Sequence, residues 1–133
     1  MHRLPIRVYY EDTDFGGVVY YAIYLKFIER GRTEALRDLG VDQVALKDEG
    51  TVFVVRRVEA DFLKPARFDD MLEIRTWAVE VKRASALLRQ EVRLGETLLF
   101  KADVTIACMG LSGRPVRIPP EISANLVQLR EEG

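Results

Sequence analysis

The sequence predicts an α+β fold in which an antiparallel sheet wraps around one long helix. The first observation is a single segment of helical periodicity at residues 20–39, where apolar residues recur every three or four positions. The second is a series of segments in which apolar residues alternate along the chain, as they do in strands. These segments are residues 51–63, 71–82, 84–94 and 97–109. One helix and four or five strands pack sensibly only as a sheet laid against that helix.

The predicted helix is preceded by a short strand at residues 3–10 and is followed by a glycine. Gly40 stands where a helix commonly ends, in the left-handed backbone conformation. Gly31 lies inside the helix and costs about 1 kcal/mol relative to alanine, which indicates a close packing contact at that point. A second, short helix is expected to open at Asp42 within the polar connection that follows.

Turn residues divide the second half of the chain into strands. Gly95-Glu96 is a tight hairpin signal, residues 111–114 form a turn, and Pro119-Pro120 ends the sheet before a short polar helix. Several strands carry apolar residues on both faces, and a second protomer is the simplest cover for the face that the helix leaves open. The residues concerned are Val52, Phe53, Val54, Val55, Val104, Ile106, Ala107 and Met109.

Length and composition predict one domain that spans residues 1–133. The chain has 20 basic and 21 acidic residues, so no excess of positive charge indicates a nucleic-acid partner. No apolar run is long enough to span a membrane, and the N-terminus lacks the apolar core of a signal peptide. We therefore expect a cytoplasmic protein.

The sequence has few reactive side chains, and this excludes many types of enzyme mechanism. His2 at the N-terminus is the only histidine and Cys108 is the only cysteine. No Ser-His-Asp triad, no Cys-His pair and no metal site built on histidine or cysteine can form within one chain, and we expect no metal. Cys108 lies in an apolar strand and is expected to be an inert core residue.

The candidate site is the loop before the helix, where residues 10–20 read YEDTDFGGVVY. Gly16 and Gly17 let a ligand approach the backbone closely, and the helix start offers unpaired N–H groups and the positive end of its dipole. Asp14 beside them could act on a carbonyl whose oxygen those N–H groups bind. The alternative is that Asp14 makes only backbone hydrogen bonds in a turn. Asp12 and Thr13 are expected to shape the loop.

Three segments carry a family resemblance: YYEDTD at residues 9–14, GVVY at 17–20 and YLKFIER at 24–30. They resemble the signature of the 4-hydroxybenzoyl-CoA thioesterase family and, within it, the acyl-CoA thioesterases associated with the bacterial Tol-Pal gene cluster. The match continues through FLKPA at 62–66, DD at 69–70 and RPVRIP at 114–119. It covers nearly the whole chain except the last dozen residues.

The resemblance implies a hotdog fold and an acyl-CoA thioesterase that needs no cofactor, since coenzyme A is part of the substrate. It also implies a homodimer joined edge to edge with active sites at the interface, and commonly a tetramer. By the family's pattern Asp14 is the catalytic carboxylate, the backbone N–H of Tyr21 is the oxyanion contact, and Gly17 belongs to the same site. The residues expected to meet the CoA phosphates are Lys82, Arg83 and Arg117.

The chain departs from its apparent relatives at Tyr21 and Ile23, where histidine and asparagine are usual. The backbone N–H of Tyr21 survives the change, but Ile23 replaces an amide and bears on substrate range and rate. Two alternatives stay open: a non-catalytic acyl-CoA-binding module, and a thioesterase acting on acyl carrier protein. A dehydratase would need a histidine at the site.

Other charged residues have plainer interpretations. Glu29 and Glu34 are expected to pair with Arg30, Arg32 or Arg37 at helical spacing. Arg56 and Arg57 are expected to be surface or interface residues.

Thioester hydrolysis fits this inventory of side chains. A thiol has a pKa of about 8.5, so its anion leaves without a strong acid. One carboxylate, acting as general base or as nucleophile, is then sufficient beside an oxyanion hole at a helix start.

Overall fold

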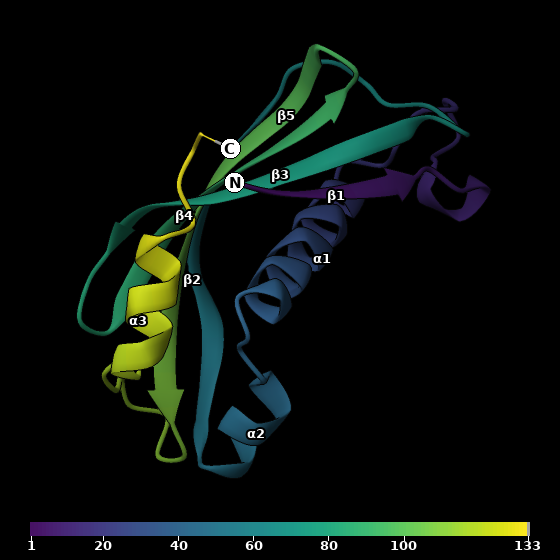
Figure 1. Ribbon diagram of the computed structural model, residues 1–133. Helices are drawn as coiled ribbons and strands as arrows, with labels where there is room; N and C mark the ends of the chain where they lie inside the picture. Colours follow the sequence, from purple (N-terminus) through teal and green to yellow (C-terminus); the bar gives the residue numbers. More distant parts are fainter. Residues whose placement is uncertain (133) are drawn as a thin grey trace.

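The structure, a computed structural model, describes residues 1–132 and consists of a five-stranded antiparallel sheet with one long helix (Figure 1). The strands are β1 His2–Arg7, β2 Thr51–Phe62, β3 Met71–Val81, β4 Ser85–Leu94 and β5 Thr97–Gly110. The helices are α1 Ile23–Asp38, α2 Gln43–Asp48 and α3 Pro120–Val127, and residues Tyr10–Asp12 form one 3-10 turn. The strand order is β1-β3-β4-β5-β2, with all neighbours antiparallel. The predicted α+β fold is confirmed.

The core lies between α1 and the inner face of the sheet, where α1 packs on β1, β3 and β4. Alternate residues of the strands point toward the helix, and each large apolar side chain buried in this way contributes about 1.5–3 kcal/mol. The largest fully buried side chains include Phe27 and Ile28 from α1 and Leu72, Ile74, Leu88, Val92, Phe100 and Val104 from the sheet. Strand β2 is an edge strand whose inner face stays partly open, although the ring of Phe62 at its end lies 5.8 Å from that of Tyr24 in α1.

The helix approaches the sheet most closely at Gly31. A Cβ atom there would lie 2.6 Å from Cγ2 of Ile74 and 3.2 Å from Nε2 of Gln90. Gln90 is fully buried, and its Nε2 donates to the carbonyl of Ile28 at 2.8 Å and to Oγ1 of Thr76 at 2.9 Å. Its Oε1 accepts from Arg32 at 3.0 Å. The packing contact predicted at Gly31 is confirmed, and it brings the helix backbone within reach of a buried polar side chain.

Helix α1 begins at Ile23, three residues later than predicted. Tyr20, Tyr21 and Ala22 form a turn instead, and their carbonyls accept hydrogen bonds from the amides of Ile23, Tyr24 and Leu25. The prediction was wrong here because the aromatic residues keep the apolar pattern although the backbone is not yet helical. The other end matches the prediction, since Gly40 has φ +85° just past the helix.

The polar segment after α1 also folds as expected. Oδ1 of Asp42 accepts from the amide of Ala45 at 3.0 Å and caps α2.

Helix α3 differs from the polar helix that was predicted at the end of the chain. Ile122 and Leu126 are buried and join the core, so the helix is amphipathic. It lies beside β3 beyond the end of β1, where the amide of Ala78 donates to the carbonyl of Leu129 at 2.7 Å. Asn125 also donates to the carbonyl of Leu39, at the end of α1, over 3.1 Å. The chain's own C-terminal helix therefore extends the core that α1 forms with the sheet.

The outer face of the central strands is mostly charged, although Trp77 and Leu87 also lie on it. Ion pairs cover it, among them Arg75–Glu73 at 2.6 Å, Arg89–Asp103 at 2.8 Å and Arg93–Glu91 at 2.8 Å. The exposed apolar side chains of β2 lie on its inner face, as their pairing with buried residues of β5 shows; they are Val55, Val58 and Phe62. The surface that lacks cover is therefore the inner face of an edge strand, rather than the outer face of the sheet.

Replacing Gly31 with valine tests the close contact between α1 and the sheet. We expect Gly31→Val to lower the free energy of unfolding by about 2 kcal/mol or more, because the added atoms overlap Ile74 and displace Gln90. Chemical denaturation followed by circular dichroism measures this. Lys26→Val, at an exposed position of the same helix, is the control and should cost only the propensity difference of about 0.5 kcal/mol. Equal effects of the two substitutions would contradict the contact.

Candidate active site

Asp14 lies in a short hairpin that precedes α1. Thr13 and Val19 form an isolated antiparallel bridge, and the amide of Gly17 donates to the carbonyl of Asp14 at 3.0 Å. Gly17 has φ +82°, a conformation that a residue with a side chain adopts only with strain. The hairpin therefore needs a glycine at that position, which is the role that the structure assigns to Gly17.

One carboxylate oxygen of Asp14 holds the turn and the other does not. Oδ1 accepts from the amide of Gly16 at 2.8 Å and from that of Val18 at 3.4 Å. Within residues 1–132, Oδ2 accepts no hydrogen bond, and the side chain is exposed. The turn role considered for Asp14 is therefore real, and it leaves one carboxylate oxygen available for chemistry.

The hairpin is tied to the segment between β2 and β3. The amide of Val19 donates to the carbonyl of Ala66 at 2.8 Å, and Val18 forms a bridge with Arg67. The amide of Ala66 donates in turn to the hydroxyl of Tyr24, at 3.0 Å, inside the core. Burial raises the pKa of Tyr24, which keeps its hydroxyl neutral. The first turn of α1 and the Asp14 hairpin thus share one anchor.

Asp12 and Thr13 shape the loop, as predicted. Oδ2 of Asp12 accepts from the amide of Tyr9 at 2.8 Å, and the hydroxyl of Thr13 donates to the carbonyl of Tyr10 at 2.8 Å.

The start of α1 offers two unpaired donors. No side chain caps the helix, and the turn at Tyr20–Ala22 satisfies the first helical amides through its carbonyls. Among the residues that the structure describes, none accepts a hydrogen bond from the amides of Tyr21 and Ala22. These N–H groups lie at the positive end of the helix dipole, where they favour a negatively charged oxygen.

Aromatic side chains surround this helix start. The rings of Tyr20 and Tyr21 are 4.8 Å apart, and Tyr21 meets Phe62 at the end of β2 at 6.1 Å. Phe62 packs in turn on Phe100 at 5.1 Å. Tyr20, Tyr21 and Phe62 are all exposed, so an open apolar surface lies beside the unpaired amides. The pKa of Tyr20 is raised mainly by its neighbour Tyr21 and, among smaller causes, by the charge of Asp14.

The three basic residues predicted to meet phosphate lie together. Lys82, Arg83 and Arg117 line one cleft of about 340 Å³, with Ser123 on its wall. The amide of Ile118 donates to the carbonyl of Arg83 at 2.8 Å and holds the C-terminal segment against the turn between β3 and β4. The fold therefore brings these three basic residues to one cleft.

The basic cleft and Asp14 lie at opposite ends of β3. The Asp14 hairpin is bound to the segment that leads into Met71, whereas Lys82 directly follows Val81. Eleven residues of strand separate the two ends, which corresponds to about 35 Å at roughly 3.3 Å per residue.

The remaining residues singled out in the sequence have structural roles. Ile23 packs against the core at the start of α1. Glu34 pairs with Arg37 as expected. Glu29 accepts a hydrogen bond from Thr33 at 2.7 Å and forms no ion pair within 4.0 Å among the described residues, but while burial lowers the pKa of Arg32, the charge of Glu29 partly opposes that shift. His2 contacts Asp38 at 2.8 Å, at the opposite end of α1 from the Asp14 hairpin.

The described residues contain neither a cluster of metal ligands nor a membrane-spanning helix. No three His, Cys, Asp or Glu side chains in residues 1–132 gather closely enough to hold a metal ion. No helix in that part of the chain is long and apolar enough to cross a membrane.

The sequence matches a known protein family over most of its length. The family model described as "Thioesterase superfamily" matches residues 16–101, which is more than half of the chain. The chain belongs to the thioesterase superfamily. The resemblance noted in the sequence is thereby confirmed.

Two relatives resemble the chain over almost its whole length. The acyl-CoA thioester hydrolase YbgC of Escherichia coli O6:H1 is 45% identical over 130 residues, which cover 96% of this chain and 97% of the relative. The acyl-CoA thioesterase YbgC of Haemophilus influenzae is 44% identical over 128 residues, covering 95% and 94%.

Solved structures of similar proteins share the fold. A probable thioesterase from Bartonella henselae superposes with a TM-score of 0.85 at 43% identity, covering 89% of this chain and 98% of that one. A hypothetical protein from Thermus thermophilus gives 0.91 at 29% identity, covering 98% and 100%. The hotdog fold implied by the resemblance is confirmed.

The buried thiol of this thioesterase-superfamily chain should not react in the folded state. Burial raises the pKa of Cys108 to about 11, because the thiolate loses its hydration, and the side chain is fully buried. At pH 8 about one thiol in a thousand is ionised, so we expect negligible labelling by a disulfide dye before unfolding and one equivalent after it. Rapid labelling of the native protein would contradict the burial of Cys108.

Proposed function

We propose that this chain is an acyl-CoA thioesterase in which Asp14 is the catalytic carboxylate and the backbone N–H of Tyr21 binds the carbonyl oxygen. The observation that carries the proposal is that the hairpin holding a carboxylate with one free oxygen leads directly into the two unpaired amides at the start of α1. Relatives at 44–45% identity that are named acyl-CoA thioesterases support the same substrate class.

The proposed reaction needs only these groups. The thioester oxygen accepts a hydrogen bond from the Tyr21 amide, and its negative charge grows as the carbonyl carbon is attacked. On the general-base route, water attacks that carbon while its proton passes to Oδ2 of Asp14. The tetrahedral intermediate then collapses, the C–S bond breaks, and CoA leaves as a thiolate, a stable anion since a thiol has a pKa of about 8.5. Oδ1 stays bound to Gly16 throughout, which holds the carboxylate in place.

On the nucleophile route Asp14 attacks the carbonyl carbon itself, the C–S bond breaks, and CoA leaves as a thiolate, so that a mixed anhydride remains, which water then cleaves. A single turnover in water labelled with heavy oxygen detects an anhydride that water opens at the Asp14 carbonyl carbon. Label recovered in the Asp14 carboxylate arises only when water opens an anhydride at that residue.

The length of β3 supports an active site shared between protomers. Asp14 and the basic cleft lie at opposite ends of β3, and a strand of this length, about 35 Å, is longer than an extended pantetheine arm. The phosphates of a CoA whose thioester lies at Asp14 would therefore meet Lys82, Arg83 and Arg117 of another copy. The unpaired edge of β2, with Val55, Val58 and Phe62 exposed, offers a surface for pairing. The homodimer, the tetramer and the cytoplasmic location stay predictions.

Exchanging the carboxylate of Asp14 for an amide tests its role. Asp14→Asn keeps an oxygen that can accept from the amides of Gly16 and Val18, so the hairpin should persist. We expect kcat for acyl-CoA hydrolysis to fall by about 10²–10⁴-fold, the usual contribution of a general base, with an unchanged thermal midpoint. Release of CoA is followed with a thiol-trapping dye.

Asp12→Asn is the matched control, since Asp12 uses its oxygen only to hold the amide of Tyr9. It should retain kcat within a few-fold. Normal turnover in Asp14→Asn would exclude Asp14 as the catalytic carboxylate, and equal losses in both variants would indicate a merely structural effect.

A further inference from the structure

We propose that Arg56 binds a phosphate group of the CoA nucleotide and that it does so from a cleft next to the one formed by Lys82, Arg83 and Arg117. This inference rests on the proposed function, because it extends the phosphate-binding surface of the same substrate. It is carried by a β-bulge, by an arginine without a carboxylate partner, and by a lysine shared between two clefts.

The bulge explains why Arg56 points out of the sheet. Val55 pairs with Ile106, but the next paired residue of β2 is Arg57, opposite Thr105, so Arg56 is an extra residue in the strand. Val55 and Val58 both face the core side of the sheet, as their buried partners on β5 show. The two residues between them therefore both project from the outer face, which a regular strand would not allow for neighbours.

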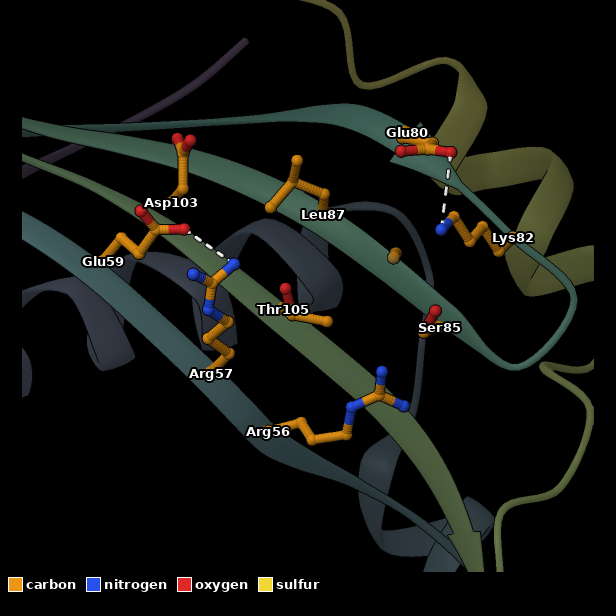
Figure 2. A pocket seen from close by; sticks show the side chains of 10 residues that line it. Arg56, Arg57, Glu59, Glu80, Lys82, Ser85, Leu87, Asp103 and Thr105 are labelled. Atoms are coloured by element: carbon orange, nitrogen blue, oxygen red, sulfur yellow. Dashed lines mark ion pairs between the residues drawn. The ribbon is translucent and has the colours of Figure 1, made fainter.

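The two neighbouring arginines differ in their partners. Nη1 of Arg57 lies 2.7 Å from Oε1 of Glu59, and Figure 2 shows this pair as a dashed line. Arg56 extends away from Glu59 toward the strand that carries Ser85 (Figure 2). Across residues 1–132 no carboxylate lies within 4.0 Å of its guanidinium. Arg57 is neutralised, whereas Arg56 keeps its charge and its donors for a ligand.

The cleft around Arg56 has a volume of about 260 Å³ and includes the hydroxyls of Ser85 and Thr105. Three carboxylates also line it, but each of them has its own cation. The pairs are Arg57–Glu59 at 2.7 Å, Lys82–Glu80 at 3.8 Å and Arg89–Asp103 at 2.8 Å. The cation left over is Arg56, so the end of the cleft beside Ser85 and Thr105 is positive. A guanidinium with nearby hydroxyl donors suits a phosphate, which a planar fork binds through two hydrogen bonds.

Lys82 connects this cleft to the second one. It lines the cleft of Arg56 and also the cleft of Arg83 and Arg117. The ion pair between Lys82 and Glu80 is long, at 3.8 Å, and both side chains are exposed. Such a pair contributes little to stability, so a phosphate can compete with Glu80 for the ammonium group of Lys82. CoA carries phosphate at two places, the diphosphate bridge and the 3′-phosphate of the ribose. Two adjoining clefts with a shared lysine match this pair of phosphate groups.

The test compares Arg56→Ala with Arg57→Ala on three thioesters of one acyl group: acyl-CoA, acyl-3′-dephospho-CoA and acyl-pantetheine. The two variants remove the same charge from adjacent residues on the same face, and only Arg56 lacks a carboxylate partner. We expect Arg56→Ala to raise KM for acyl-CoA by about tenfold at unchanged kcat, the scale of one charged hydrogen-bonding contact. Arg57→Ala should change KM less than threefold, and acyl-pantetheine should show no effect of either variant.

The three substrates also identify the phosphate. If the effect of Arg56→Ala disappears with acyl-3′-dephospho-CoA, Arg56 binds the 3′-phosphate; if it persists there and disappears only with acyl-pantetheine, Arg56 binds the diphosphate. Both results support the proposal. A normal KM in Arg56→Ala, equal effects of the two variants, or an effect that persists with acyl-pantetheine would each overturn it.

Failure of the proposed function has a separate signature. An unmodified protein that hydrolyses none of the three thioesters contradicts the thioesterase assignment itself. If the unmodified protein and Arg56→Ala hydrolyse acyl-CoA with the same KM, only the role of Arg56 is contradicted. Inhibition by free CoA and free 3′-dephospho-CoA gives the same comparison without relying on turnover.

Discussion

The contact between α1 and the sheet at Gly31 determines where the candidate site lies. Because no side chain separates the helix from the sheet there, Gln90 reaches the carbonyl of Ile28 and joins the helix backbone to β4. The first turn of α1 is held independently, through the hydroxyl of Tyr24 and the amide of Ala66. With two such anchors the helix cannot slide along the sheet, and the unpaired amides at its start keep a constant position beside the Asp14 hairpin.

The sequence predicted the elements well where periodicity is strong and less well where local hydrogen bonds decide. The strands begin and end within a few residues of their predicted limits, because alternation marks every residue of a strand that covers a core. The start of α1 was placed too early, since Tyr20 and Tyr21 are apolar in a turn as well as in a helix. Glu29 was predicted to pair with an arginine, yet its carboxylate accepts a hydrogen bond from the hydroxyl of Thr33, one helical turn away.

The site could be predicted in part for a similar reason. A carboxylate beside two glycines and a helix start is visible in the sequence, and so are the basic residues around the turn between β3 and β4. What the sequence does not show is that the two groups lie at opposite ends of a strand, because that depends on the direction of β3 in the fold. Nor does it show that Arg56 and Arg57 differ, since a bulge appears only when the strand is paired with its neighbour.

The bulge in β2 also bears on how such a protein can change. If Arg56 were deleted, Val55, Arg57 and Val58 would still alternate between the core and the outer face. An extra residue at this point therefore leaves the packing of the core untouched, and a side chain of any chemistry can occupy it at little structural cost. Evolution is free to vary ligand recognition there while the interior of the sheet stays the same.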